Sequence, residues 1–446
     1  MKHVTTLLHA RWVIPVEPAD QVLEHHSVAI EDGRIVALLP SREARSHFSA
    51  EHVVELDKHA LIPGFINAHT HAAMTLMRGY ADDMPLQIWL EEHIWPTEAA
   101  WVDPEFIRDG TRLAIAEMVR GGTTCFNDMY FFPDEVAREV EHAGIRAGLG
   151  LVVLDFPSAW AQNADEYLHK GLAVHDQLRH NPLLHTMLAP HAPYSVSDQA
   201  LSKVVMYAEE LDLPVHMHVH ETASEVSQAR LQTGRTPLER LTELGLVGPR
   251  LLAVHMTQLT DEEIAQFAAS GAHVVHCPES NLKLASGFCP VAKLLKHGVN
   301  VALGTDGAAS NNDLDMLGEM RTAALLAKGV AHDASAVPAM TALRMATING
   351  ARALGIDHIT GSIEPGKAAD LTAIRLEQLE TQPLYNPLSK LVYAATREQV
   401  TDVWVAGQHL LKERRLTTLD EEDILMRAKR WQQKLRRTDQ PREESP

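Results

Sequence analysis

The chain has 446 residues, of which 45% are hydrophobic, so it can bury a large core as several domains or as one extended α/β barrel. Its formal net charge of −19 argues against nucleic acid as a partner, and no apolar run approaches the roughly 20 residues of a membrane helix. The N-terminal stretch is interrupted by His and Arg and is not typical of a signal peptide, and Cys125, Cys277 and Cys289 show no CxxC spacing. We therefore expect a cytoplasmic protein with neither disulfides nor a membrane contact.

Both ends of the chain carry short β segments. Residues 28–39 form two predicted strands around an Asp32-Gly33 turn, a strong hairpin signal. Similar segments recur at 369–374 and 400–410. The sequence therefore predicts one small β-sandwich domain built from residues 1–62 and 361–420. Residues 421–446 are expected to form a C-terminal helix and a frayed polar tail.

The middle of the chain, residues 63–360, alternates short apolar runs with helical patterns. One such pattern, Asp261–Gly271, has an acidic start and a glycine stop. The apolar runs number eight, at 61–71, 123–129, 147–154, 185–191, 215–220, 251–255, 273–278 and 299–306. Eight β/α units over this length predict a (β/α)8 TIM-type barrel, whose active site lies at the C-terminal ends of its strands.

The first run ends in His69-Thr70-His71. Side chains at i and i+2 of a strand point to the same face, so two imidazoles there can grip one divalent cation. The chain holds 26 histidines, however, and His216, His218 and His220 form a second alternating set. Because these three share one face, their spacing does not decide which of them is a ligand.

Polar residues recur where the predicted strands end. Any one of them is compatible with a hydrogen-bonded histidine at a barrel mouth, but the whole set favours a metal site: His69, His71, His191, His218, Glu221, His255, His276 and Asp306. Three histidines and a carboxylate suit a single Zn²⁺ or similar ion, which lowers the pKa of a bound water to about 7. We expect Asp306 to bind the metal and accept a proton from the water. Glu221 is expected to donate a proton to the substrate, and His255 to orient the water.

The chain resembles the amidohydrolase superfamily at several motifs. These are Pro63-Gly-Phe-x-Asn-x-His-x-His71, His218-x-x-Glu221, His255, Thr305-Asp-Gly307 and the segment 361–371. The resemblance implies His69, His71, His218 and Asp306 as metal ligands, with Glu221 and His255 in proton transfer and water orientation. It leaves the roles of His216, His220 and His276 open. The fourth predicted strand, 186–191, lacks the lysine of dinuclear members, which implies one metal, most simply Zn²⁺.

Within that superfamily the chain is similar to 5-methylthioadenosine/S-adenosylhomocysteine deaminases. The similarity covers residues 89–98, 127–131, 189–194 and 307–312. It implies that Glu98 grips the ribose hydroxyls, that His191 contacts the nucleoside, and that Trp89 and Ser310 line the pocket. Without it, Glu98 would be taken for a solvated helix residue and Trp89 for a core residue as readily as a pocket residue.

The expected reaction is hydrolytic replacement of the adenine 6-amino group, with release of ammonia. The segment 149–160 lacks the arginines that some members direct at an amino-acid tail, which favours 5′-methylthioadenosine over S-adenosylhomocysteine, with adenosine also open. Alternatives are a triazine hydrolase, a guanine-type deaminase, or a non-catalytic binding protein stabilised by metal. A homo-oligomer, dimer or tetramer, is expected from the resemblance.

Overall fold

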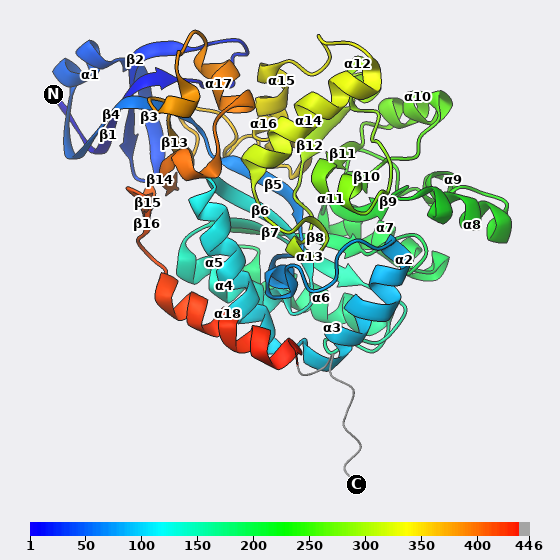
Figure 1. Cartoon of the computed structure of the whole chain (residues 1–446). Coiled ribbons are helices and arrows are strands. Elements are labelled where there is room, and N and C mark those ends of the chain that lie inside the picture. Colours follow the sequence, from blue (N-terminus) through cyan, green and yellow to red (C-terminus); the bar gives the residue numbers. More distant parts are fainter. Residues whose placement is uncertain (437–446) are drawn as a thin grey trace.

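The structure, a computed structural model, describes residues 1–436 and contains two eight-stranded sheets (Figure 1). One sheet is a nearly closed barrel of parallel strands in chain order, which confirms the predicted TIM-type barrel. The barrel strands are β5 (Phe65–Thr70), β6 (Thr123–Tyr130), β7 (Arg146–Val153), β8 (Leu184–Pro190), β9 (Val215–Val219), β10 (Leu251–His255), β11 (His273–His276) and β12 (Asn300–Leu303). Past β12 the chain returns to β5, where the Asp306 amide donates to the His69 carbonyl at 3.0 Å.

Helices surround the barrel, and several of them begin at polar caps. Thr260 caps α10, a capping box with Glu263 reinforces it, and Gly271 ends it in the left-handed region, as the sequence predicts. The helices are α4 (Pro104–Arg120), α5 (Pro133–Ala143), α6 (Ala164–Leu178), α7 (Asp198–Leu211), α8 (Ala223–Thr233), α9 (Pro237–Glu243), α10 (Asp261–Ser270), α11 (Pro278–Lys283), α12 (Val291–Lys296), α13 (Ala308–Asn311), α14 (Met316–Ala331), α15 (Ala339–Met345) and α16 (Ile348–Ala353).

A helical insertion separates β5 from α4 at the mouth of the barrel. It consists of η1 (Ala72–Met77), α2 (Leu86–Ile88), the π-helical turn η2 (Trp89–Ile94) and α3 (Trp95–Trp101). π-Helical turns are rare and are often found at functional sites. This one presents its buried side chains to the cavity described below.

The second sheet joins the two chain ends. Its order is β16 (Arg415–Leu416), β15 (Gln408–Lys412), β14 (Val400–Val405), β13 (Leu371–Arg375), β4 (Phe48–Pro63), β1 (Lys2–Val13), β2 (Leu23–Glu31) and β3 (Arg34–Pro40). Strands β4 and β13, from opposite ends of the chain, pair antiparallel, so the predicted composite of both ends is present. The predicted turn at Asp32 and Gly33 has φ of 49° and 74°. The shorter elements are α1 (Ser41–His47), η3 (Leu379–Thr381), α17 (Pro387–Tyr393) and η4 (Arg397–Gln399).

The second sheet feeds directly into the barrel. Strand β4 ends at Pro63, and after Gly64 the chain enters β5. A Cβ on Gly64 would lie 2.1 Å from the Thr124 side chain of β6, so only glycine fits this approach. The close packing fixes where β5 begins, and therefore where His69 and His71 emerge.

The C-terminal helix α18 (Glu421–Arg436) lies against α4 (Figure 1). Trp431 is buried there, and its indole N–H donates to Asp109 at 2.9 Å. The predicted polar tail falls on residues 437–446, outside the described part of the chain. Across residues 1–436 no helix has the length and apolar character needed to span a membrane.

Candidate active site

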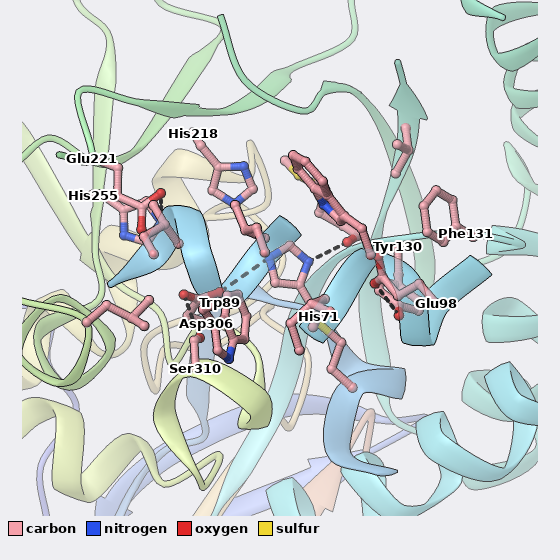
Figure 2. Close-up of a pocket in the computed structure, with 18 residues that line it drawn as sticks. His71, Trp89, Glu98, Tyr130, Phe131, His218, Glu221, His255, Asp306 and Ser310 are labelled. Atoms are coloured by element: carbon pink, nitrogen blue, oxygen red, sulfur yellow. Dashed lines mark hydrogen bonds and ion pairs between the residues drawn. The ribbon is translucent and has the colours of Figure 1, made fainter. Parts of the chain in front are cut away.

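Four imidazoles, those of His69, His71, His218 and His255, and the Asp306 carboxylate converge at the C-terminal ends of the barrel strands. Figure 2 labels all of them except His69. His69 Nε2 lies 3.2 Å from His218 Nε2 and 3.3 Å from Asp306 Oδ1, and His71 Nε2 also lies 3.3 Å from Asp306 Oδ1. His255 completes a second group with His69 and His218. In a tetrahedral Zn²⁺ site with bonds of about 2.0–2.1 Å, neighbouring ligand atoms are about 3.3 Å apart. Three pairs of these ligand atoms therefore lie at separations that suit one ion.

The second ring nitrogens of the cluster are engaged behind it. Nδ1 of His71 donates to the Met129 carbonyl at 2.6 Å, and Nδ1 of His218 donates to the His191 carbonyl at 2.7 Å. His255 Nδ1 lies 2.8 Å from Asn281 Oδ1. A neutral imidazole that donates through Nδ1 has its lone pair on Nε2. These contacts therefore leave Nε2 free to accept a metal ion or a proton at the centre.

The electrostatics of the cluster also favour a cation beside Asp306. Burial opposes ionisation of Asp306, yet hydrogen bonds from His69 and His71 hold its pKa well below the usual range. Burial works against a proton on His71, yet the hydrogen bond and charge of Asp306 raise the pKa of His71 to about 9. A positive charge beside the Asp306 carboxylate is thus stabilised, and a divalent ion supplies it more strongly than a proton does.

Asp306 is held by three donors besides the histidines. Ser280 and Ser310 hydroxyls donate to its Oδ2 at 2.6 and 2.9 Å, and the Gly307 amide donates to Oδ1 at 2.8 Å. Ser310, expected in the substrate pocket, lines the cavity and also braces this carboxylate. Asp306 and His255 have φ of 63° and 73°, a costly conformation for residues with a Cβ and one that is concentrated at functional sites.

Glu221 faces His255 across the centre. Its Oε2 lies 3.8 Å from His255 Nε2, and Ser286 donates to Oε1 at 3.4 Å. Burial raises the pKa of Glu221 above its ordinary value, although the charge of His255 opposes this. A buried carboxyl whose pKa is raised holds its proton more readily, which suits a general acid.

A cavity extends from the centre toward the helical insertion. Figure 2 shows Glu221 and His255 on one side of His71, and Tyr130 and Glu98 on the other. The Tyr130 hydroxyl donates to Glu98 Oε1 at 2.6 Å, and burial raises the pKa of Glu98 to about 7, against the effect of that hydrogen bond. The apolar part of the wall includes Leu86, Trp89, Leu90, Ile94, Trp95, Phe131, Val152 and Leu284.

Of the other two expected substrate contacts, Trp89 lines the cavity and His191 does not. Trp89 lines the cavity, with its indole N–H bonded to the Ala81 carbonyl at 3.1 Å. His191 packs edge-on to His218 with ring centroids 4.9 Å apart, and its Nδ1 lies 2.9 Å from Ser195 Oγ. His191 is partly exposed but is not among the described residues that line this cavity, so its contact with the nucleoside stays a prediction.

The histidines whose roles the sequence leaves open differ from one another. His220 donates through Nδ1 to the Gln258 carbonyl and accepts the Leu238 amide at Nε2, so both of its nitrogens bind backbone. His216 instead reaches His69 Nδ1 at 2.9 Å. His276 is buried, and its Nδ1 has no hydrogen-bond partner in the described part of the chain.

Sequence reasoning assigned no role to Tyr130, Ser280 or Asn281. Tyr130 belongs to the segment 127–131 that carries the resemblance, and it ends strand β6. Ser280 and Asn281 follow β11 directly in α11. All three lie at the C-terminal end of a barrel strand, which is the signal by which they could have been found.

Comparison with known proteins adds to this geometry. A sequence model described as the amidohydrolase family matches residues 60–410. A 5-methylthioadenosine/S-adenosylhomocysteine deaminase of Teredinibacter turnerae (strain ATCC 39867 / T7901) is 50% identical over 438 residues, 98% of this chain and 99% of the relative. The chain belongs to the amidohydrolase family and to its 5-methylthioadenosine/S-adenosylhomocysteine deaminases.

Solved structures resemble this amidohydrolase over nearly its full length. An adenosine deaminase from Xanthomonas campestris with bound zinc matches with a TM-score of 0.97 and 54% identity, covering 98% of this chain and 99% of the other. A mutant atrazine chlorohydrolase from Arthrobacter aurescens TC1, complexed with zinc and atraton, matches with a TM-score of 0.89 and 25% identity, covering 96% and 100%.

Proposed function

We propose that this amidohydrolase is a metal-dependent hydrolytic deaminase that converts the 6-amino group of 5′-methylthioadenosine to a 6-oxo group and releases ammonia. One observation carries the proposal: a single cavity holds the histidine–aspartate cluster and Glu221 at one end and the buried Glu98–Tyr130 pair at the other. A nucleoside has a reactive ring carbon at one end and a ribose diol at the other, which matches this layout.

We infer that His69, His71, His218 and Asp306 hold one divalent ion, most simply Zn²⁺. When bound, such an ion acidifies a water molecule and makes it a nucleophile at neutral pH. The zinc in the X. campestris relative supports this choice, as do the separations of 3.2–3.3 Å between His69 and His218, His69 and Asp306, and His71 and Asp306. His255 Nε2, directed at the same centre, orients the water.

The positions of the Glu221 and Asp306 carboxyl groups suggest the order of the proton transfers. Water adds to C6 while Glu221, which burial keeps protonated more readily, gives its proton to the neighbouring ring nitrogen. Asp306 takes the proton that the water loses and passes it to the amino group, which leaves as ammonia. Glu221 then recovers a proton from the new oxygen, so the enzyme returns to its starting state.

We place the ribose and the 5′ substituent of the substrate at the end of the cavity formed by the helical insertion. Tyr130 occupies Oε1 of Glu98, which leaves Oε2 to accept from the ribose hydroxyls. The described residues that line the cavity include no Arg or Lys, so an amino-acid carboxylate gains no cationic partner there. A methylthio group suits the apolar wall, and we infer a higher kcat/KM for 5′-methylthioadenosine than for S-adenosylhomocysteine.

The test is ammonia release together with the adenine-to-hypoxanthine ultraviolet shift. It compares 5′-methylthioadenosine, S-adenosylhomocysteine, adenosine, guanine and a chlorotriazine, with and without Zn²⁺. Zinc-dependent turnover, highest for the methylthio compound, is expected. Turnover of only guanine or the triazine would keep the metal chemistry and overturn the role of Glu98. Zinc binding without any turnover would favour a binding protein.

We also propose a cytoplasmic homo-oligomer, dimer or tetramer. Cys125, Cys277 and Cys289 are buried and unpaired, which suits a reducing compartment. The molar mass in solution, from light scattering, tests the oligomeric state.

A further inference from the structure

A line of buried polar side chains runs from the cluster into the barrel core. His69 Nδ1 lies 2.9 Å from His216 Nε2, and His216 Nδ1 lies 3.2 Å from the amide nitrogen of Asn127. The three residues come from β5, β9 and β6, and all are fully buried. Most buried polar groups in proteins are hydrogen-bonded, so we expect the protons along this line to be arranged consistently.

With the Asn127 amide oriented as it is in the structure, each hydrogen bond along this line is donated toward the metal-binding cluster. The Asn127 amide nitrogen donates to the Ala68 carbonyl at 3.1 Å and to His216 Nδ1. A neutral His216 that accepts at Nδ1 carries its proton on Nε2 and donates to His69 Nδ1. His69 then carries its own proton on Nε2, 3.3 Å from Asp306 Oδ1.

A ligand role for His69 Nε2 requires the opposite arrangement. His69 must donate through Nδ1 to His216 Nε2, and His216 must in turn donate through Nδ1. The nearest side-chain group, the Asn127 amide, can receive that proton only through its oxygen. The amide must therefore turn over, giving up its bond to Ala68.

The barrel core can accommodate the turned amide. Asn127 Oδ1 and His185 Nε2 are both buried without a partner among the described residues. Both face the position that a Cβ of Gly148 would fill, at 2.5 and 2.8 Å from it. Gly148 pairs with Asn127 of β6 on one side and with His185 of β8 on the other. Because glycine has no side chain, Asn127 Oδ1 and His185 Nε2 face the same space beside it. A turned amide directs its N–H groups toward His185 Nε2.

We propose that Asn127 and His216 are positioning residues for the metal ligand His69. In the metal-binding form the Asn127 oxygen accepts from His216, and this fixes His69 as the Nδ1–H tautomer with its Nε2 lone pair on the ion. The inference rests on the proposed metal site. It adds two residues that touch neither substrate nor metal but set how tightly the metal is held.

The experiment measures the Zn²⁺ dissociation constant by competition with a chromophoric chelator, and the visible spectrum of the Co²⁺-substituted protein. Asn127→Leu removes the acceptor, and we expect about 10–100-fold weaker zinc binding and an altered cobalt spectrum. Asn127→Asp keeps an acceptor without needing to turn and should bind zinc at least tenfold more tightly than Asn127→Leu. Asn349→Leu is the matched control, since Asn349 is also a buried asparagine bonded to a strand carbonyl, that of Val301.

A second pair guards against a variant that fails to fold. His216→Gln offers His69 Nδ1 a carbonyl acceptor and should bind zinc more tightly than His216→Leu. Zinc binding by Asn127→Leu within threefold of the unaltered chain would overturn the proposal. So would equal losses in both members of either pair, or an equal loss in Asn349→Leu. No zinc binding by the unaltered chain would instead overturn the metal site on which the proposal rests.

Discussion

Glu221 lies beside the centre but outside the described groups of side chains that could hold the ion. Its carboxylate lies 3.8 Å from His255 Nε2, and it is absent from the two groups of side chains that could bind a metal. We therefore expect Glu221→Gln to keep the metal and to lower kcat by about 10²–10⁴-fold. Metal content by emission spectroscopy and single-turnover rates check this. Near-normal turnover would contradict the assignment.

We expect Glu98 to make substrate binding depend on pH. Burial raises its pKa to about 7, so the carboxyl loses its charge as the pH falls through neutrality. The ionised form is the better acceptor for two hydroxyls, and KM should rise below about pH 7 and level off above it.

Glu98→Gln supplies the control for this pH profile. It should raise KM by about 10–100-fold, because a charged acceptor is lost, and should remove the pH dependence of KM. The measurement is KM between about pH 5.5 and 8.5 for both proteins. An unchanged profile in the variant would assign the titration to another group.

At the residue scale, the sequence predicts those site residues that strand periodicity or a place at the end of a strand makes recognisable. His69 and His71 are recognisable because a strand has a period of two, and Asp306 because it follows an apolar run. The choice among His216, His218 and His220 depends on the reach of each side chain, which period alone does not encode. Tyr130 acts on Glu98 across 32 positions of sequence, a contact that only the folded barrel creates.

At the element scale, all eight predicted barrel strands are present, because buried parallel strands leave apolar runs that turn residues delimit. The helical insertion between β5 and α4 was not predicted as such. Its π-helical turn has no periodic signature of its own, and its buried apolar residues both line the cavity and pack in the core.

The contact between α18 and α4 is predicted to be a major source of stability. Trp431 packs edge-on to Phe106, with ring centroids 5.2 Å apart, and bonds to Asp109. Trp431→Ala should lower the free energy of unfolding by about 3–5 kcal/mol. Trp431→Phe, which keeps a ring there, should cost less. Thermal and urea unfolding measure both. Activity of the folded variants should persist, since no described residue of α18 lines the cavity.

At the scale of the whole molecule, we propose the division expected from the sequence: residues 1–62 and 361–420 as one domain, 63–360 as the barrel, and 421–446 as an appended segment. The pairing of β4 with β13 supports the composite domain, because it joins strands from opposite ends of the chain. The close approach of Gly64 to Thr124 fixes the junction between this domain and the first barrel strand, so both the domain and the barrel set the position of the site.

The proposed metal would tie together strands that meet where the barrel closes. His69 lies in β5 and His71 directly follows it, while Asp306 follows β12, the last strand of the barrel, which contacts β5. An ion shared by these side chains should therefore stabilise the closure as well as serve the chemistry. A free-metal concentration about 1,000 times the dissociation constant adds about 4 kcal/mol to the free energy of unfolding.

Removal of metal by a chelator should accordingly lower the melting temperature and speed amide hydrogen exchange in β5 and β12 first. Adding Zn²⁺ back should reverse both effects. The double variant His71→Ala, Asp306→Ala lacks two of the four proposed ligands and should show no zinc-dependent shift. If the chelated and zinc-loaded chains melt together, the ion does not hold the barrel closed. If the double variant still responds to zinc, the ion lies elsewhere.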